Sequence, residues 1–149
     1  MNEIETSKPQ LFGRAFWLIF LLVTLWVNAS EIFRYFVFVL PMMRDALSAV
    51  ADVAPVNIPV FASWMLWDTV LVCALLGFTW IFLDRFGEGW RNGLIAGTLA
   101  WAAIFGLLWL GLLNMNLATS QILLVALPLS WLELAVGGLI VSWGRGRFA

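Results

Sequence analysis

Four ionisable side chains lie inside long apolar runs of this 149-residue chain: Glu31, Arg34, Asp68 and Glu133. An ionisable group in hydrocarbon is costly, so such residues usually face the interior of a helical bundle and pair with one another. Arg34 follows Glu31 by three residues, a spacing at which two side chains can pair on one helix. These residues are therefore the first candidates for chemistry.

The charges of this group do not balance, because three carboxylates face one guanidinium. Arg34 can neutralise one acid and bridge to a second. The remaining carboxylate must then be protonated, hydrated or paired with something outside the chain. This surplus predicts a site that binds or passes a proton, a cation or a cationic small molecule. A polar clamp that ties three helices together is the alternative, and both interpretations stay open.

The three acids also lie at similar depths in their apolar runs. At 1.5 Å per residue, Glu31, Asp68 and Glu133 fall roughly 14, 12 and 16 Å from the same side of the predicted bundle. Asn28 shares the helix face of Glu31, and Asn114 closes the third apolar run on that side. We therefore add Asn28 and Asn114 to the candidate ligand- or ion-binding residues.

Several classes of chemistry lack their usual residues. The chain has no histidine and one cysteine, Cys73, so the commonest transition-metal ligand is missing and an internal disulfide is impossible. We find no phosphate loop and no nucleophile–base pair, and we expect no metal and no cofactor. An intramembrane enzyme that uses the carboxylates as acid and base is the least favoured reading. A net charge of −1 without a basic surface predicts no nucleic-acid partner.

Composition indicates how these residues are positioned. The chain is 63% hydrophobic, 11% charged and has a mean hydropathy of +0.97, whereas soluble domains carry roughly a quarter charged residues. This predicts an all-α membrane protein, with four transmembrane helices in a bundle that forms a single domain over residues 1–149. The predicted spans are residues 15–40, 60–83, 91–113 and 122–143.

The longest connection between spans covers residues 42–59, on the side opposite both chain ends. Pro41 is expected to end the first span. Apolar residues then recur at helical spacing opposite a polar side, which predicts a short amphipathic helix on the membrane surface. The apolar positions are Met43, Leu47, Val50 and Ala54. A plain loop that caps the bundle is the alternative.

The basic residues outside the spans predict the orientation of the chain. Arg44 falls on one side, and all the others fall on the opposite side: Lys8, Arg14, Arg85, Arg91, Arg145 and Arg147. The excess of Lys and Arg marks the cytoplasmic side. We therefore expect a multi-pass protein of a cell (inner) membrane with cytoplasmic tails at residues 1–11 and 144–149.

The ten tryptophans agree with this arrangement. They cluster where the headgroup regions are expected, as in the aromatic belts of membrane proteins. Near the cytoplasmic side lie Trp17, Trp80, Trp90 and Trp143. Near the other side lie Trp64, Trp67, Trp109 and Trp131, while Trp26 and Trp101 lie deeper.

Small residues predict close helix packing in the third and fourth spans. Gly93 and Gly97 form a GxxxG step, which lets two helix backbones approach. On an ideal helix their stripe continues through Ala100, Leu107, Gly111 and Asn114. A corresponding stripe on the fourth span contains Ser130, Glu133 and Gly137. The steps could pack the bundle internally or hold an oligomer together.

Two functional hypotheses follow. The first is a small membrane protein whose acidic cluster, open to the outer side, handles a proton, a cation or a cationic small molecule. The second is an accessory or scaffold subunit of a larger membrane complex, in which the charge cluster is a structural clamp. The expected partners are the lipid bilayer and either further copies of the chain or a larger membrane complex.

Overall fold

The computed structural model describes residues 13–50, 53 and 55–148, and all regular secondary structure in them is helical. The tail predicted at residues 1–11 lies outside these residues. The elements are α1 (Arg14–Arg34), η1 (Tyr35–Val39), α2 (Leu40–Ala46), α3 (Ile58–Phe86), α4 (Trp90–Trp101), η2 (Ala102–Gly106), α5 (Leu107–Asn114) and α6 (Ser120–Phe148), where η denotes a π-helix.

The π-helices continue their neighbours without a break, so the eight elements form four long helices. These four are long and apolar enough to cross a membrane, as the sequence predicts: Arg14–Ala46, Ile58–Phe86, Trp90–Asn114 and Ser120–Phe148. Each extends beyond the predicted span at one or both ends.

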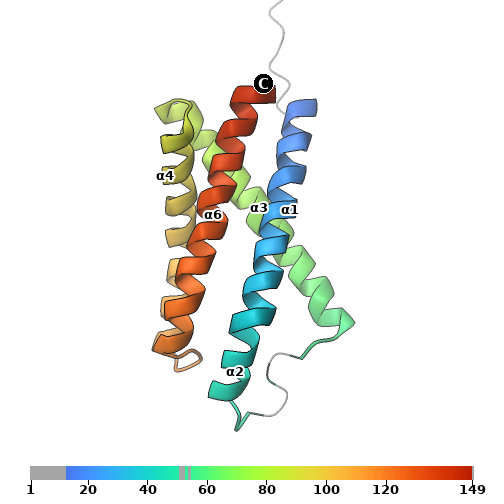
Figure 1. The fold of residues 1–149 in the computed structure, drawn as a ribbon, viewed down its shortest axis with the longest axis vertical. Helices are drawn as coiled ribbons and strands as arrows, with labels where there is room; N and C mark the ends of the chain where they lie inside the picture. The colour runs from blue at the N-terminus through green and yellow to red at the C-terminus, as the bar shows by residue number, and fades with distance from the viewer. Residues whose placement is uncertain (1–12, 51–52, 54, 149) are drawn as a thin grey trace, which may run out of the picture.

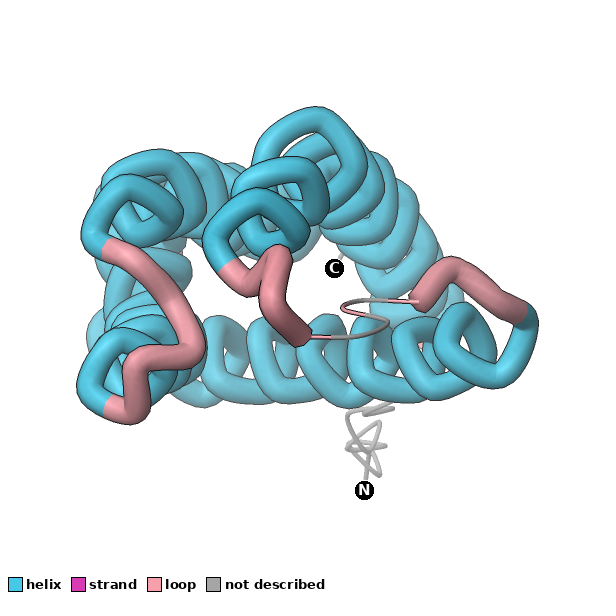
Figure 2. Tube along the Cα trace, turned by 90° about the horizontal axis from the view of Figure 1, so that it is seen from below, coloured by secondary structure: helices cyan, strands magenta, loops and turns pink. Residues whose placement is uncertain are grey.

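Helix α6 packs against the other three long helices, most extensively against α4 and α1, and α3 also contacts all three of the others. Figure 1 shows α6 between α1 and α4, with α3 crossing behind at a steep inclination. The view along the long axis shows α3 running along one side of the molecule (Figure 2). Helix α6 can therefore bring residues of α1, α3 and α4 together.

The close approach of α4 to α6 depends on glycine. A Cβ atom added at Gly97 would collide with the backbone of α6 at Leu134, and one added at Gly138 would collide with the backbone of α4 at Gly93. The GxxxG step therefore packs within the chain. Its partner on α6 is Gly138, one residue beyond the Gly137 that the sequence pattern singled out.

Two other glycines of α6 lie where α3 and α1 pack against this helix. A Cβ atom at Gly137 would lie 2.6 Å from Cδ2 of Leu75 on α3, and one at Gly144 would lie 2.6 Å from Cγ1 of Ile19 on α1. Each neighbour of α6 thus has its own glycine contact, which explains how one helix can pack closely on three sides.

The first helix does not end at Pro41, contrary to the prediction, but continues to Ala46. Proline fits at the first positions of a helical segment, because its missing N–H would have no helical partner there. Here Pro41 lies two residues past η1, at whose end the N–H of Leu40 bonds to the carbonyl of Tyr35, five residues back. This wider turn of the π-helix lies at the position where, in a regular α-helix, the proline ring would clash with the preceding turn of the backbone.

The separate surface helix predicted within residues 42–59 is not observed in the described part of that segment. Residues 42–46 complete the first long helix, residues 47–50 form turns and a bend, and α3 starts at Ile58. The side chain of Asn57 caps α3 by accepting from the N–H of Val60 at 3.1 Å. The prediction was wrong because it took Pro41 as a stop; Ala54, which it included, lies outside the described residues.

The predicted stripe of small residues on the third span is correct only as far as Ala100. Gly93, Gly97 and Ala100 are buried against α6, but Leu107 is 68% exposed. The π-turn of η2 adds a residue to the helical repeat, so the buried residues are Phe105 within η2 and Trp109 in α5. Trp109 is consequently buried rather than part of an aromatic belt, and Asn114 is exposed.

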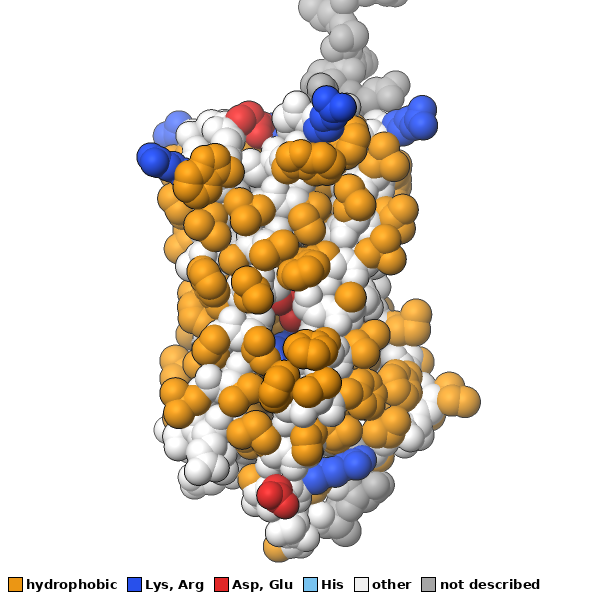
Figure 3. Space-filling model, viewed as in Figure 1, with side chains coloured by type: hydrophobic (Ala, Val, Ile, Leu, Met, Phe, Trp, Pro, Cys, Tyr) orange, Lys and Arg blue, Asp and Glu red, His pale blue; other side chains and the backbone are white. Residues whose placement is uncertain are grey.

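Charged groups mark the two ends of the molecule, and hydrophobic side chains cover the length between them (Figure 3). We call the end where α1 begins and α6 finishes the basic end. Arg145 joins elements there: it donates to the carbonyl of Trp80 at 3.0 Å and lies 2.7 Å from the carboxylates of both Asp84 and Glu88. It thereby ties the end of α6 to α3 and to the turn before α4.

Candidate functional site

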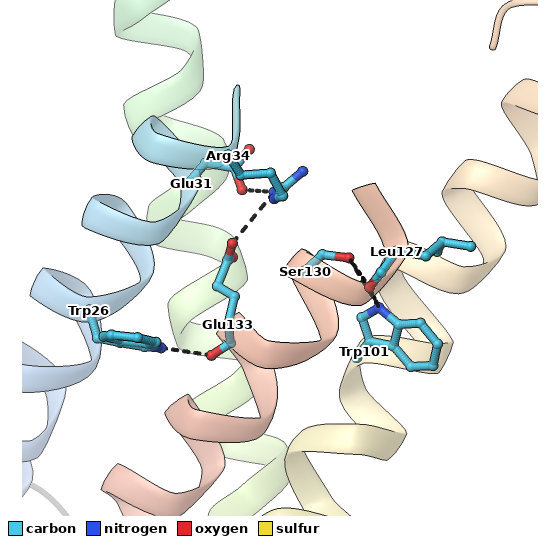
Figure 4. Close-up of polar contacts among 7 residues, drawn as sticks. All are labelled: Trp26, Glu31, Arg34, Trp101, Leu127, Ser130 and Glu133. Carbon is cyan, nitrogen blue, oxygen red and sulfur yellow. Dashed lines mark hydrogen bonds and ion pairs between the residues drawn. The ribbon is translucent and has the colours of Figure 1, made fainter. Parts of the chain in front are cut away.

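Arg34 lies at the centre of a buried charge cluster formed by Arg34, Glu31 and Glu133 (Figure 4). Its Nη2 atom forms an ion pair with Oε2 of Glu31 and lies 3.5 Å from Oε2 of Glu133. The side chain of Arg34 is 4% exposed and that of Glu133 is fully buried. The structure therefore brings together two of the predicted acids with the predicted base.

The elements around the cluster explain its position. Arg34 is the last residue of α1, directly before η1, and its guanidinium lies 4.9 Å from the centre of the Phe105 ring in η2. The indole N–H of Trp26 on α1 donates to the backbone carbonyl of Glu133 at 2.9 Å. This hydrogen bond holds α1 and α6 at the register at which Arg34 reaches Glu133.

The polar atoms of the cluster are incompletely satisfied. Among the described residues, neither carboxylate oxygen of Glu133 accepts a hydrogen bond, and Nε of Arg34 donates none. A buried charge normally persists only when it is both paired and hydrogen-bonded. The arrangement therefore leaves acceptor capacity at Glu133 for a proton or a water molecule.

Asp68, on α3, lines a cavity together with Glu31 of this cluster. Its half-buried side chain has no hydrogen bond or ion pair with any other described residue, although its charge interacts with those of Glu31 and Arg34. Asp68 and Glu31 line a cavity of about 350 Å³. The other lining residues are apolar or aromatic: Trp64, Trp67, Leu71, Ile104, Phe105 and Leu108. Asp68 is thus the carboxylate that remains without a cationic partner.

Neither of the two predicted asparagines takes part in the ion pairs. Asn28 is half-buried and donates to the carbonyl of Thr24 on its own helix at 2.9 Å. Asn114 is exposed at the end of α5, nine residues past Phe105 and so about 14 Å further along the helix. The structure does not bring Asn114 to the cluster, because it belongs to the end of the helix rather than to the depth of the acids.

Three aromatic residues of the cavity were not predicted as site residues: Trp64, Trp67 and Phe105. Trp64 precedes Asp68 by four residues, so helical spacing could have placed it beside this carboxylate. Trp67 directly precedes Asp68, a spacing that gives no such signal. Their position near the predicted headgroup region indicated an aromatic belt instead. No comparable signal marked Phe105, whose direction depends on the π-turn of η2.

Comparison with known proteins gives no relative for this site. The chain matches no protein-family model, no curated protein and no solved structure. In residues 13–50, 53 and 55–148, no three His, Cys, Asp or Glu side chains are grouped so that they could hold a metal ion. The geometry and charges of the site are therefore the basis for the functional proposal.

Proposed function

We propose that this chain is a multi-pass membrane protein that binds a cation at Asp68 and Glu31. In this proposal the four long helices cross a cell membrane as a bundle, with both chain ends on the cytoplasmic side. The concentration of basic residues at one end of the molecule supports that orientation. The exposed aliphatic and aromatic side chains along the helices supply the surface that lipid would cover.

The unpaired carboxylate of Asp68 is the observation that carries the proposal. Arg34 already lies beside the carboxylates of Glu31 and Glu133, which together balance its positive charge. Asp68 therefore has no cationic partner of its own. A carboxylate beside a cavity among apolar walls attracts a positive charge strongly, because little water screens it. A proton, an inorganic cation or a cationic small molecule would each balance the negative charge of Asp68. The buried carboxylate of Glu133 could accept a proton in addition.

Single neutralisation of the acids tests the proposal. We expect Asp68→Asn, Glu31→Gln and Glu133→Gln each to weaken cation binding or cation-dependent flux in purified, reconstituted protein. Asp45→Asn is the matched control, because Asp45 is an exposed carboxylate on α2, outside the cavity. The proposal fails if all three variants assemble normally and equal the wild type in both binding and flux.

A scaffold subunit of a larger membrane complex is the second candidate. The burial of Arg34 between acids of α1 and α6 favours it, since such a group can hold two helices in register without any ligand. It predicts that the chain purifies with larger partners in mild detergent at native expression levels. Recovery of only a free monomer or homo-oligomer would count against it.

A further inference from the structure

The cavity at Asp68, which we call the wedge, is lined by residues of α3 on one side and of η2 and α5 on the other. Helix α3 packs against α4 near the basic end, while toward the opposite end its inclination carries it away from α5 (Figure 1). Trp67 and Leu108, which line the cavity from the two sides, are 71% and 51% exposed. In a membrane these side chains would face lipid, so the wedge opens sideways toward the bilayer.

The side chains of this wedge combine negative charge with aromatic surface. Among the described residues that line it, Glu31 and Asp68 are the two charged side chains and none is basic. The remaining walls are hydrocarbon and the rings of Trp64, Trp67 and Phe105. Tryptophan faces attract cations more strongly than other aromatic rings do, and more so when water is excluded.

This chemistry suits an organic cation better than a metal ion. Calcium and magnesium require about six or more oxygen ligands, whereas the wedge offers two carboxylates among apolar walls. An ammonium group with apolar substituents can use both features, the charge at the acids and the substituents at the rings. The volume of about 350 Å³ also falls within the range of roughly 300–1,000 Å³ typical of small-molecule sites.

We infer that the wedge binds a small amphiphilic organic cation, an amine or quaternary ammonium with alkyl or aryl substituents, that enters sideways from the bilayer. The cationic group lies near the carboxylates of Asp68 and Glu31, and the apolar part packs against Trp64, Trp67 and Phe105. This inference rests on the proposed cation site and names the class of its ligand.

Calorimetric titration with phenyltrimethylammonium tests the inference. The protein is held in dodecyl maltoside micelles, whose headgroups carry no ammonium, and sodium, potassium and magnesium chlorides are titrated in parallel. We expect saturable binding of the organic cation, weakened about tenfold or more by Asp68→Asn and about threefold by Trp67→Leu. Because Trp67 is largely exposed, its replacement leaves the fold intact and provides a second test if Asp68→Asn does not fold.

Two matched variants serve as controls. Asp45→Asn removes an exposed carboxylate elsewhere, and Trp90→Leu removes a tryptophan that is 64% exposed at the basic end. Both should bind the probe as the wild type does. Equal binding to all variants would show partition into micelles and overturn the inference.

Other results separate the inference from the proposed function. If only inorganic cations or protons bind, in a manner that depends on Asp68, the cation site stands and the organic ligand is wrong. If no cation of any kind binds, both fail. Displacement of the probe by added phosphatidylethanolamine at stoichiometric amounts would assign the wedge to a lipid headgroup and overturn the small ligand.

Discussion

Arg34 is held in place by groups from three of the four long helices. Glu31 pairs with it from α1, Glu133 approaches it from α6, and the ring of Phe105 in η2 covers it. The guanidinium therefore neutralises two acids that would otherwise be buried alone. Its loss should be more damaging than the loss of the whole cluster.

Replacing Arg34 by methionine tests this reasoning. Arg34→Met leaves Glu31 and Glu133 without a counter-charge, and breaking a buried pair in this way costs about 3–5 kcal/mol. We expect that loss in the free energy of unfolding, measured by denaturant titration in micelles with circular dichroism. The triple variant Arg34→Met, Glu31→Met and Glu133→Met should recover most of it, because no buried charge remains. A single variant as stable as the wild type would contradict the account.

Much of the charge cluster could be predicted from residue types alone. The three-residue spacing of Glu31 and Arg34 predicts their pairing, and the similar depths of the acids predict that Glu133 lies near them. The sequence could not show that Arg34 would be shared by Glu31 and Glu133 while Asp68 stayed unpaired. That division depends on the inclination of α3, which results from packing and leaves no pattern in the sequence.

At the scale of the elements, the two π-turns explain why some predictions from ideal helical spacing were wrong. The number and approximate bounds of the four long helices follow from hydropathy, and these predictions match the helices observed. The GxxxG step predicts a close approach of two helices, but its spacing left open whether the partner lies within the chain. An ideal helical repeat, however, extends the stripe of the third span through Leu107 and Gly111, whereas η2 shifts burial to Phe105 and Trp109. A π-turn has no strong sequence signature, so residues beyond it cannot be assigned to a face from spacing.

Two glycines of the third long helix offer a matched pair of variants. At Gly97 an added methyl group meets the backbone of α6, whereas at Gly111 it meets nothing within 4 Å. Gly97→Ala should therefore lower the free energy of unfolding by about 1–3 kcal/mol through overpacking. Gly111→Ala should be neutral or raise it by about 0.5–1 kcal/mol, because alanine favours the helix. The same unfolding titration measures both, and equal effects at the two positions would refute the proposed close approach.

At the scale of the whole molecule, the concentration of basic residues at one end predicts that this end faces the cytoplasm, and cysteine labelling can test that orientation. In spheroplasts of a chain with Cys73→Ser, Ser48→Cys should react with a membrane-impermeant maleimide before lysis. Gly146→Cys should react only after the membrane is permeabilised. Both positions are exposed, one in the turn after α2 and the other near the end of α6, so accessibility within the protein does not limit labelling. The reverse pattern, or labelling of both in intact spheroplasts, would contradict the orientation.

The packing of all other helices around α6 has a consequence for biogenesis. α6 is the last of the four helices in the chain, so during synthesis α1 would enter the membrane before Glu133 exists. Glu31 and Arg34 must then pass through the translocation machinery as neighbours on one helix, and their mutual pairing lowers the penalty of inserting either alone. The close contacts of α1, α3 and α4 with α6 could form only once the glycines of α6 had arrived. The approach of Arg34 to Glu133 would therefore follow its pairing with Glu31.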